Sequence, residues 1–152
     1  MADVVSLEQR RGLMARRIEA LLGVEPTVTL QPDPGDADVC CSVRLRAAGD
    51  GFWVGLVYDK SLLAERVRMG MRPVFVVHHD GETPVVSGGC EARLCGRATS
   101  PADLDERGRA AVGRLLHSWG LGDPELVVLR LRLVDVQVDD GEAPLHGALP
   151  RT

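Results

Sequence analysis

The sequence lacks any apolar run long enough to cross a bilayer. Its longest runs, such as FWVGLVY at 52–58, fall well short of the ~20 residues that a membrane helix needs. The N-terminal stretch also lacks the basic region, apolar region and small-residue cleavage site of a signal peptide. We therefore expect a cytoplasmic protein with no membrane segment.

An excess of positive charge is also absent. The 152 residues carry a formal net charge of −4, and Lys60 is the only lysine. Attraction to nucleic acid by bulk electrostatics needs the opposite sign of charge. We therefore expect no nucleic-acid partner.

The cysteines lack a metal-binding spacing. An adjacent pair, Cys40 and Cys41, and a second pair five residues apart, Cys90 and Cys95, match no common zinc pattern. Neighbouring residues of a strand point to opposite faces, so Cys40 and Cys41 are not expected to share a site. We expect four reduced cysteines and no bound metal.

Catalytic motifs are missing too. The sequence contains no Gly-x-Ser-x-Gly elbow, no P-loop and no dinucleotide-binding glycine fingerprint. It also shows no order of Ser, His and Asp that would suggest a triad. We therefore assign no catalytic residue from the sequence.

What the sequence does contain is the pattern of one mixed domain. The length suits a single core, which we expect at 1–141, followed by a flexible tail at 142–152. Alternating or continuous apolar patterns predict strands, and 3.6-residue periodicity predicts helices. The expected strands lie at 27–30, 38–48, 52–58, 73–79, 85–98 and 125–138.

Three helices are expected, each beginning at a serine in the N-cap position. These serines are Ser6, Ser61 and Ser100. In the long third helix, Pro101 would take the first helical position and Asp103 would complete a capping-box-like spacing. The second helix is short, and we expect it to end at about Arg68.

Two strands have irregular patterns. Gly88 and Gly89 indicate a bulge or a bend in the strand at 85–98. In the last strand the apolar positions change parity between Leu133 and Val134, which predicts a bulge or sharp bend. Long bent antiparallel strands with helices packed on them favour a small closed or half-closed barrel, a mainly β fold of the α+β class.

Three stretches resemble the pyridoxamine 5′-phosphate oxidase-like flavin-binding family. FWVGLVYDKSLLAERVRMGMRPVFVVHHDG is similar to the family's strand, polar junction, short helix and strand. CEARLCGRATSPADLDERGRAAVGRLL resembles its strand ending in Gly-Arg-Ala before a helix, and VVLRLRLVDVQVDDG resembles its closing strand. The resemblance covers about 6–141. It implies an antiparallel split β-barrel, with an N-terminal helix, a short helix and a long helix packed on it.

The resemblance also implies a homodimer with a cofactor groove between the subunits. The family's cofactor is FMN or, in some members, deazaflavin, and some relatives of the fold bind haem. Ser61 falls on the family's phosphate-binding Ser, whereas the family's Lys falls on Leu63. That departure leaves open a cofactor-free binding or accessory protein on the same fold.

The residues themselves suggest a phosphate site around Ser61. A helix N-terminus presents unpaired N–H groups, to which Ser61 would add a hydroxyl and Lys60 a charge. Arg44 or Arg66 could add forked donors. The alternative is that Ser61 only caps the helix and the basic side chains are solvated.

Tyr58 and Val57, at the end of the preceding strand, complete the predicted cofactor-binding set. Tyr58 would border a flavin ring or close the core with its hydroxyl at the surface. For haem, the predicted axial ligand is His78 or His79, each of which could instead be a surface residue.

Glu91, Arg93 and Arg97 share the non-core parity of their strand. That face would be a charged dimer surface, a cofactor-facing wall or a solvated face. The function expected from the sequence is an FMN- or deazaflavin-dependent oxidoreductase acting on a small molecule. The alternatives are a haem-binding protein and a cofactor-free binding protein.

Overall fold

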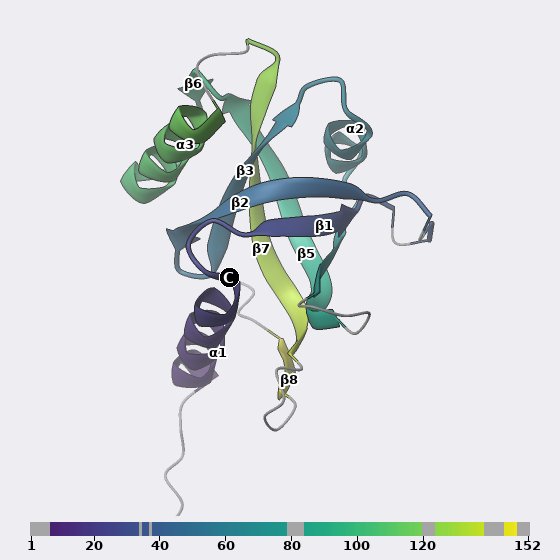
Figure 1. The fold of residues 1–152 in the computed structure, drawn as a ribbon, viewed down its shortest axis with the longest axis vertical. Helices are drawn as coiled ribbons and strands as arrows, with labels where there is room; N and C mark the ends of the chain where they lie inside the picture. The colour runs from purple at the N-terminus through teal and green to yellow at the C-terminus, as the bar shows by residue number, and fades with distance from the viewer. Residues whose placement is uncertain are drawn as a thin grey trace, which may run out of the picture.

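The computed structural model describes residues 7–33, 35–36, 38–78, 84–119, 124–138 and 145–148, and these form a strongly twisted β-sheet with three helices (Figure 1). The helices are α1 (Leu7–Leu22), α2 (Leu62–Arg68) and α3 (Glu106–Trp119). The strands are β1 (Thr27–Gln31), β2 (Cys41–Gly49), β3 (Phe52–Tyr58), β4 (Val74–His78), β5 (Pro84–Arg97), β6 (Ser100–Pro101), β7 (Leu126–Val138) and β8 (Leu145–Ala148).

All strand pairings are antiparallel, in the order β6-β5-β4-β1-β2-β3-β7-β8, and β7 also pairs with β5. The six strands from β5 to β7 in that order therefore each have at least two hydrogen-bonded neighbours among the described residues. The arrangement is consistent with a split barrel and confirms the predicted fold class. Strand β8 lies within the segment assigned to a flexible tail, and pairs with β7.

The apolar core is divided between the two faces of the sheet. The first cluster joins inward-facing residues of the strands to α1 through Ile18 and to α2 through Leu63 and Val67. Trp53 is the largest side chain in it and is 2% exposed. In Figure 1, α1 and α2 lie toward opposite ends of the sheet.

The second cluster lies on the outer face, beneath α3. Ala111, Val112 and Leu115 of the helix pack against outward-facing residues of β3 and β7, such as Val54 and Val128. Because β3 is buried on both faces, its sequence is a continuous apolar run. The predicted strand at 52–58 is therefore confirmed residue for residue.

The predicted start of the long helix is wrong. Ser100 and Pro101 form β6, which pairs back on Gly96 and Arg97 instead of opening the helix. Asp103 has a φ of 58°, in the left-handed region, so the chain cannot yet follow a helical path. Asp105 caps the helix, because its Oδ1 accepts a hydrogen bond from Gly108 N at 2.8 Å.

The cap of the short helix is confirmed. Ser61 has extended dihedral angles, φ −67° and ψ 155°, and its side chain accepts a hydrogen bond from Ala64 N. The third predicted cap, Ser6, lies outside the described residues.

The bulge predicted in the last strand is confirmed, and it lies opposite Gly89. In β5 itself Gly88 and Gly89 pair in regular register with Phe75 and Val74, so the extra residue is not in that strand. Gly89 pairs with Asp135, whereas the next residue, Cys90, pairs with Leu133. Val134 is therefore an extra residue in β7, and both Leu133 and Val134 are buried. This bulge explains why the apolar positions of the strand change parity between Leu133 and Val134.

Candidate functional site

The predicted site lies where β3 gives way to α2. The Ser61 Oγ accepts a hydrogen bond from Ala64 N at 3.1 Å, so the hydroxyl satisfies one of the helix's free amides. The Ser61 backbone N–H donates to Tyr58 O at 3.0 Å, which closes a turn between strand and helix. Two hydrogen bonds thus hold the junction, and the Ser61 hydroxyl already has a structural role.

A pocket of about 300 Å³ opens beside this junction. Three of the predicted cofactor-binding residues, Val57, Tyr58 and Ser61, line it, and most of the remaining lining is apolar. Tyr58 is 49% exposed, so its ring contributes to the open side of the pocket. An apolar lining with a few polar groups is typical of a site that holds a ring system.

The predicted cations do not converge on that pocket. Arg44 is exposed, 3.9 Å from Glu25 across an ion pair, and Arg66 forms an ion pair with Glu65 at 3.6 Å. Lys60 is exposed on the surface next to Ser61. None of these three lines the pocket.

A different arginine fixes the junction. Arg68, in the last turn of α2, forms an ion pair with the Asp59 carboxylate and donates to Asp59 O at 2.7 Å. The pair ties both ends of the short helix together, and sequence reasoning missed it. The opposite charges nine residues apart were the available signal, but they meet only because α2 folds back on its own entry.

The two proposed haem ligands are not tested. His78 is the last residue of β4, and its side chain is outside the described part of the structure. His79 lies wholly outside the described residues. Both remain predictions.

The cysteines differ from expectation in one respect. Cys40 and Cys41 both line the pocket beside Ser61. The alternation argument fails here because β2 begins at Cys41, so Cys40 is not part of a strand. None of the four cysteines forms a disulfide. Burial, together with the charge of Cys40, raises the pKa of Cys41.

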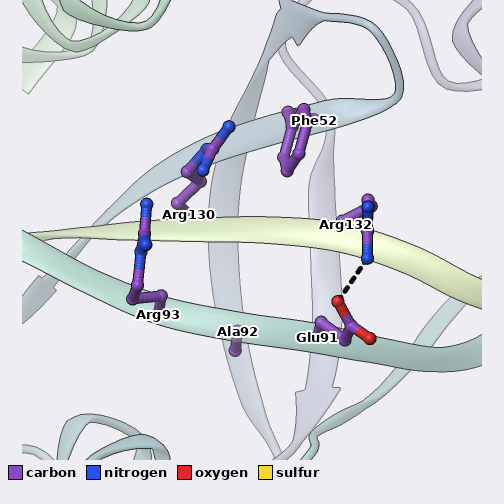
Figure 2. Close-up of a pocket in the computed structure, with 6 residues that line it drawn as sticks. All are labelled: Phe52, Glu91, Ala92, Arg93, Arg130 and Arg132. Carbon is purple, nitrogen blue, oxygen red and sulfur yellow. Dashed lines mark hydrogen bonds and ion pairs between the residues drawn. The ribbon is translucent and has the colours of Figure 1, made fainter. Parts of the chain in front are cut away.

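A larger pocket, of about 580 Å³, lies on the outer face of β3, β5 and β7 (Figure 2). Its polar lining consists of Glu91 and Arg93 of β5 and Arg130 and Arg132 of β7, with Phe52 of β3 at the edge. The sequence pattern predicted the outward parity of Glu91 and Arg93. It did not identify Arg130 or Phe52 as their neighbours, because that depends on strand register.

Two classes of feature are absent from the described residues. No group of three or more His, Cys, Asp or Glu side chains is placed to hold a metal ion. No described helix is both long and apolar enough to span a membrane.

Comparisons with known proteins support the fold. No sequence-family model matches the chain, and no curated protein sequence is significantly similar to it. The chain is similar in structure to general stress protein 26 from Bacillus anthracis, with a TM-score of 0.62 at 13% identity over 88% of this chain and 98% of that one.

Two further solved structures are similar. One is a protein from Clostridium acetobutylicum related to general stress protein 26, of the pyridoxinephosphate oxidase family (TM-score 0.56, 8% identity, 93% and 96% covered). The other is a candidate pyridoxamine 5′-phosphate oxidase from Listeria innocua (TM-score 0.53, 15% identity, 82% and 97% covered). At these identities the likeness shows that the chain shares their fold.

Proposed function

We propose that this protein binds a flavin, FMN or a deazaflavin, and acts as a homodimeric oxidoreductase on a small molecule. The observation that carries the proposal is the pocket beside the β3–α2 junction, which three of the predicted residues line. The shared fold with proteins of the pyridoxinephosphate oxidase family adds support.

The residues of this chain fit the ring end of a flavin better than its phosphate end. Val57, Tyr58 and Leu63 give the apolar and aromatic surface that a ring needs. The proposed phosphate contact is the Ser61 hydroxyl, with Lys60 as a nearby charge. Arg44 and Arg66 would join only by leaving Glu25 and Glu65, which costs little because both ion pairs are at least partly exposed.

A bound flavin would supply the hydride chemistry, which no side chain of this protein supplies. The protein would bind the phosphate, orient the ring and shape the substrate pocket. We expect the second subunit to cover the open side where Tyr58 lies.

The first experiment is an absorption spectrum of the purified protein, followed by titration with FMN, a deazaflavin and haem. We expect flavin or deazaflavin bands, or saturable uptake of one of these cofactors. Light scattering coupled to size-exclusion chromatography should give the mass of a dimer.

Two substitutions of Ser61 separate capping from phosphate binding. Ser61→Asp keeps an N-cap acceptor but adds a negative charge, whereas Ser61→Thr keeps the hydroxyl. We expect Ser61→Asp to weaken FMN binding at least about tenfold and Ser61→Thr to retain it, with similar melting temperatures. Equal FMN affinity in both variants would remove Ser61 from the site.

One observation favours a second function, a cofactor-free binding protein. The Ser61 hydroxyl is used by the helix, and two of the predicted cations already have acidic partners. A colourless protein that takes up none of the three cofactors would support this alternative and contradict the flavin proposal. A Soret band that is lost in His78→Ala or His79→Ala would instead identify haem as the cofactor.

A further inference from the structure

The pocket on the outer face of β3, β5 and β7 has an unusual charge arrangement. Arg93 of β5 lies directly opposite Arg130 of β7 in the sheet register. Like charges directly opposite each other on antiparallel strands repel and destabilise the pair. Neither arginine has an acidic partner within ion-pair distance in the part of the chain that the structure describes.

The next pair along the same strands is balanced. Arg132 lies opposite Glu91, and its Nη2 donates to Glu91 Oε2 at 2.5 Å. Arg72 lies 4.0 Å from the other Glu91 oxygen. The Glu91 charge is therefore engaged by Arg132 and Arg72, and it does not neutralise Arg93 and Arg130.

The lining as a whole has a charge of +2, since three arginines face one glutamate. Asp50 and Asp105 line a smaller cavity, of about 70 Å³, that shares Phe52 and Arg130 with this pocket. Neither aspartate forms an ion pair with Arg130 among the described residues. The two positive charges in excess are therefore those of Arg93 and Arg130.

Phe52 fixes the position of one guanidinium. The Cζ of Arg130 lies 3.7 Å from the centroid of the Phe52 ring, and the Cζ of Arg132 lies 5.7 Å from it. Cation–π contacts of this kind orient an arginine without consuming its N–H donors. Figure 2 shows Arg130 and Arg132 beside the ring, with Arg93 on the adjacent strand.

We propose that this pocket binds the phosphate dianion of a small phosphorylated compound between Arg93 and Arg130. A phosphate monoester carries a charge close to −2 at neutral pH and accepts forked hydrogen bonds from guanidinium groups. Its charge offsets the repulsion of the paired arginines. The volume of about 580 Å³ leaves room for an organic group beyond the phosphate.

This site is separate from the pocket proposed for the flavin. Phe52 begins β3 and Tyr58 ends it, so the two pockets lie at opposite ends of one strand. Six residues of extended strand span roughly 20 Å. Between them, α3 covers Val54 and Leu56 on the same outer face.

The test uses phenyl phosphate and inorganic phosphate as probes. Their binding is measured by calorimetric titration and by thermal unfolding of the protein. We expect phenyl phosphate to bind, to raise the melting temperature and to lose affinity as salt is added. Phenyl sulfate, of similar shape with a single negative charge, should bind more weakly. If phenyl phosphate binds more tightly than inorganic phosphate, the natural ligand is an organic phosphate ester. If the two bind equally, the ligand is the free phosphate ion. Either result supports an anion site in this pocket.

Arg93→Gln is the informative variant, because Arg93 is exposed and has no ion pair to lose among the described residues. We expect it to lower phenyl phosphate affinity about tenfold or more, while the ligand-free protein melts at the same or a higher temperature. Arg114→Gln, an exposed arginine of α3, makes the same change in net charge and should leave binding unchanged.

Three results would overturn the proposal. The first is the absence of phosphate or phenyl phosphate binding to the wild-type protein at millimolar concentration. The second is equal binding by wild-type protein and Arg93→Gln. The third is loss of FMN binding in Arg93→Gln, which would make both pockets parts of one flavin site.

Discussion

At the scale of the residue, the burial of Cys90 makes the free energy of unfolding depend on pH. Its thiol is fully buried on β5 and donates to Pro73 O at 3.3 Å. Burial raises the pKa of Cys90 from an ordinary 9.0 to about 12. The folded protein therefore keeps this thiol neutral in a range of pH where the unfolded chain ionises.

The stability contributed by the neutral thiol is complete below pH 9.0 and is lost as pH rises toward about 12. Within that window the free energy of unfolding should fall by ~1.4 kcal/mol per pH unit on this account. Urea denaturation at about pH 8 and about pH 10.5 should show a fall roughly 2 kcal/mol larger in wild-type protein than in Cys90→Ala. An equal fall in both proteins would contradict this assignment.

Gly55 shows how tightly the inner face is packed. A Cβ at this position would lie 2.9 Å from Leu45 Cδ2 and 3.0 Å from Val43 Cγ1. We expect Gly55→Ala to lower the free energy of unfolding by about 1–3 kcal/mol. Gly113→Ala is the matched control, because nothing lies within 4 Å of that position on α3, and it should stabilise by about 0.5–1 kcal/mol.

At the scale of the element, the start of α3 tests which residue caps the helix. Asp105→Ala removes the acceptor for Gly108 N and should cost about 1 kcal/mol. Asp105→Asn retains a capping oxygen and should restore most of that stability. Ser100→Ala should change the free energy of unfolding by less than about 0.5 kcal/mol. A larger loss in Ser100→Ala than in Asp105→Ala would show that the cap lies where the sequence pattern placed it.

The elements differ in how far the sequence determines them. Local chemistry was sufficient for β3, whose two faces are both apolar, and for Ser61, whose helix begins at the next residue. It was insufficient for Ser100, because a cap and a short strand compete there. Pairing with Gly96 and Arg97 decides that competition, and no local pattern reveals a pairing partner.

The same limit applies to the candidate sites. Val57, Tyr58 and Ser61 are close in sequence, so the structure brings them to one pocket as predicted. Arg44 meets its acidic partner, Glu25, only after folding. Arg66 pairs with Glu65, its neighbour in the sequence. Phe52, Arg93 and Arg130 come from three strands and meet only through the register of the sheet.

At the scale of the whole molecule, the sheet separates two apolar clusters that share the same strands. Leu30, inside the sheet, and Leu115, on α3, belong to different clusters and are both fully buried. Leu30→Ala and Leu115→Ala should each cost about 2–5 kcal/mol. Because the residues share no cluster, the double variant should be additive within about 0.5 kcal/mol.

Denaturant titrations followed by tryptophan fluorescence and by circular dichroism would measure this additivity. We expect coincident transitions, since the two clusters are joined by the backbone of β3 and β7. A coupling energy well above 1 kcal/mol, or separate transitions for the two probes, would contradict the description of two independently packed faces in one cooperative domain.

The exposed position of Lys60 has a practical consequence. It is the only lysine in the sequence, and it immediately precedes Ser61, which lines the candidate pocket. An amine-reactive fluorophore directed at lysine side chains can therefore attach at only one place in the fold. The fluorescence of a dye at that place should rise or fall as a ligand fills the neighbouring pocket. The wild-type protein therefore carries its own attachment site for an optical sensor of ligand binding.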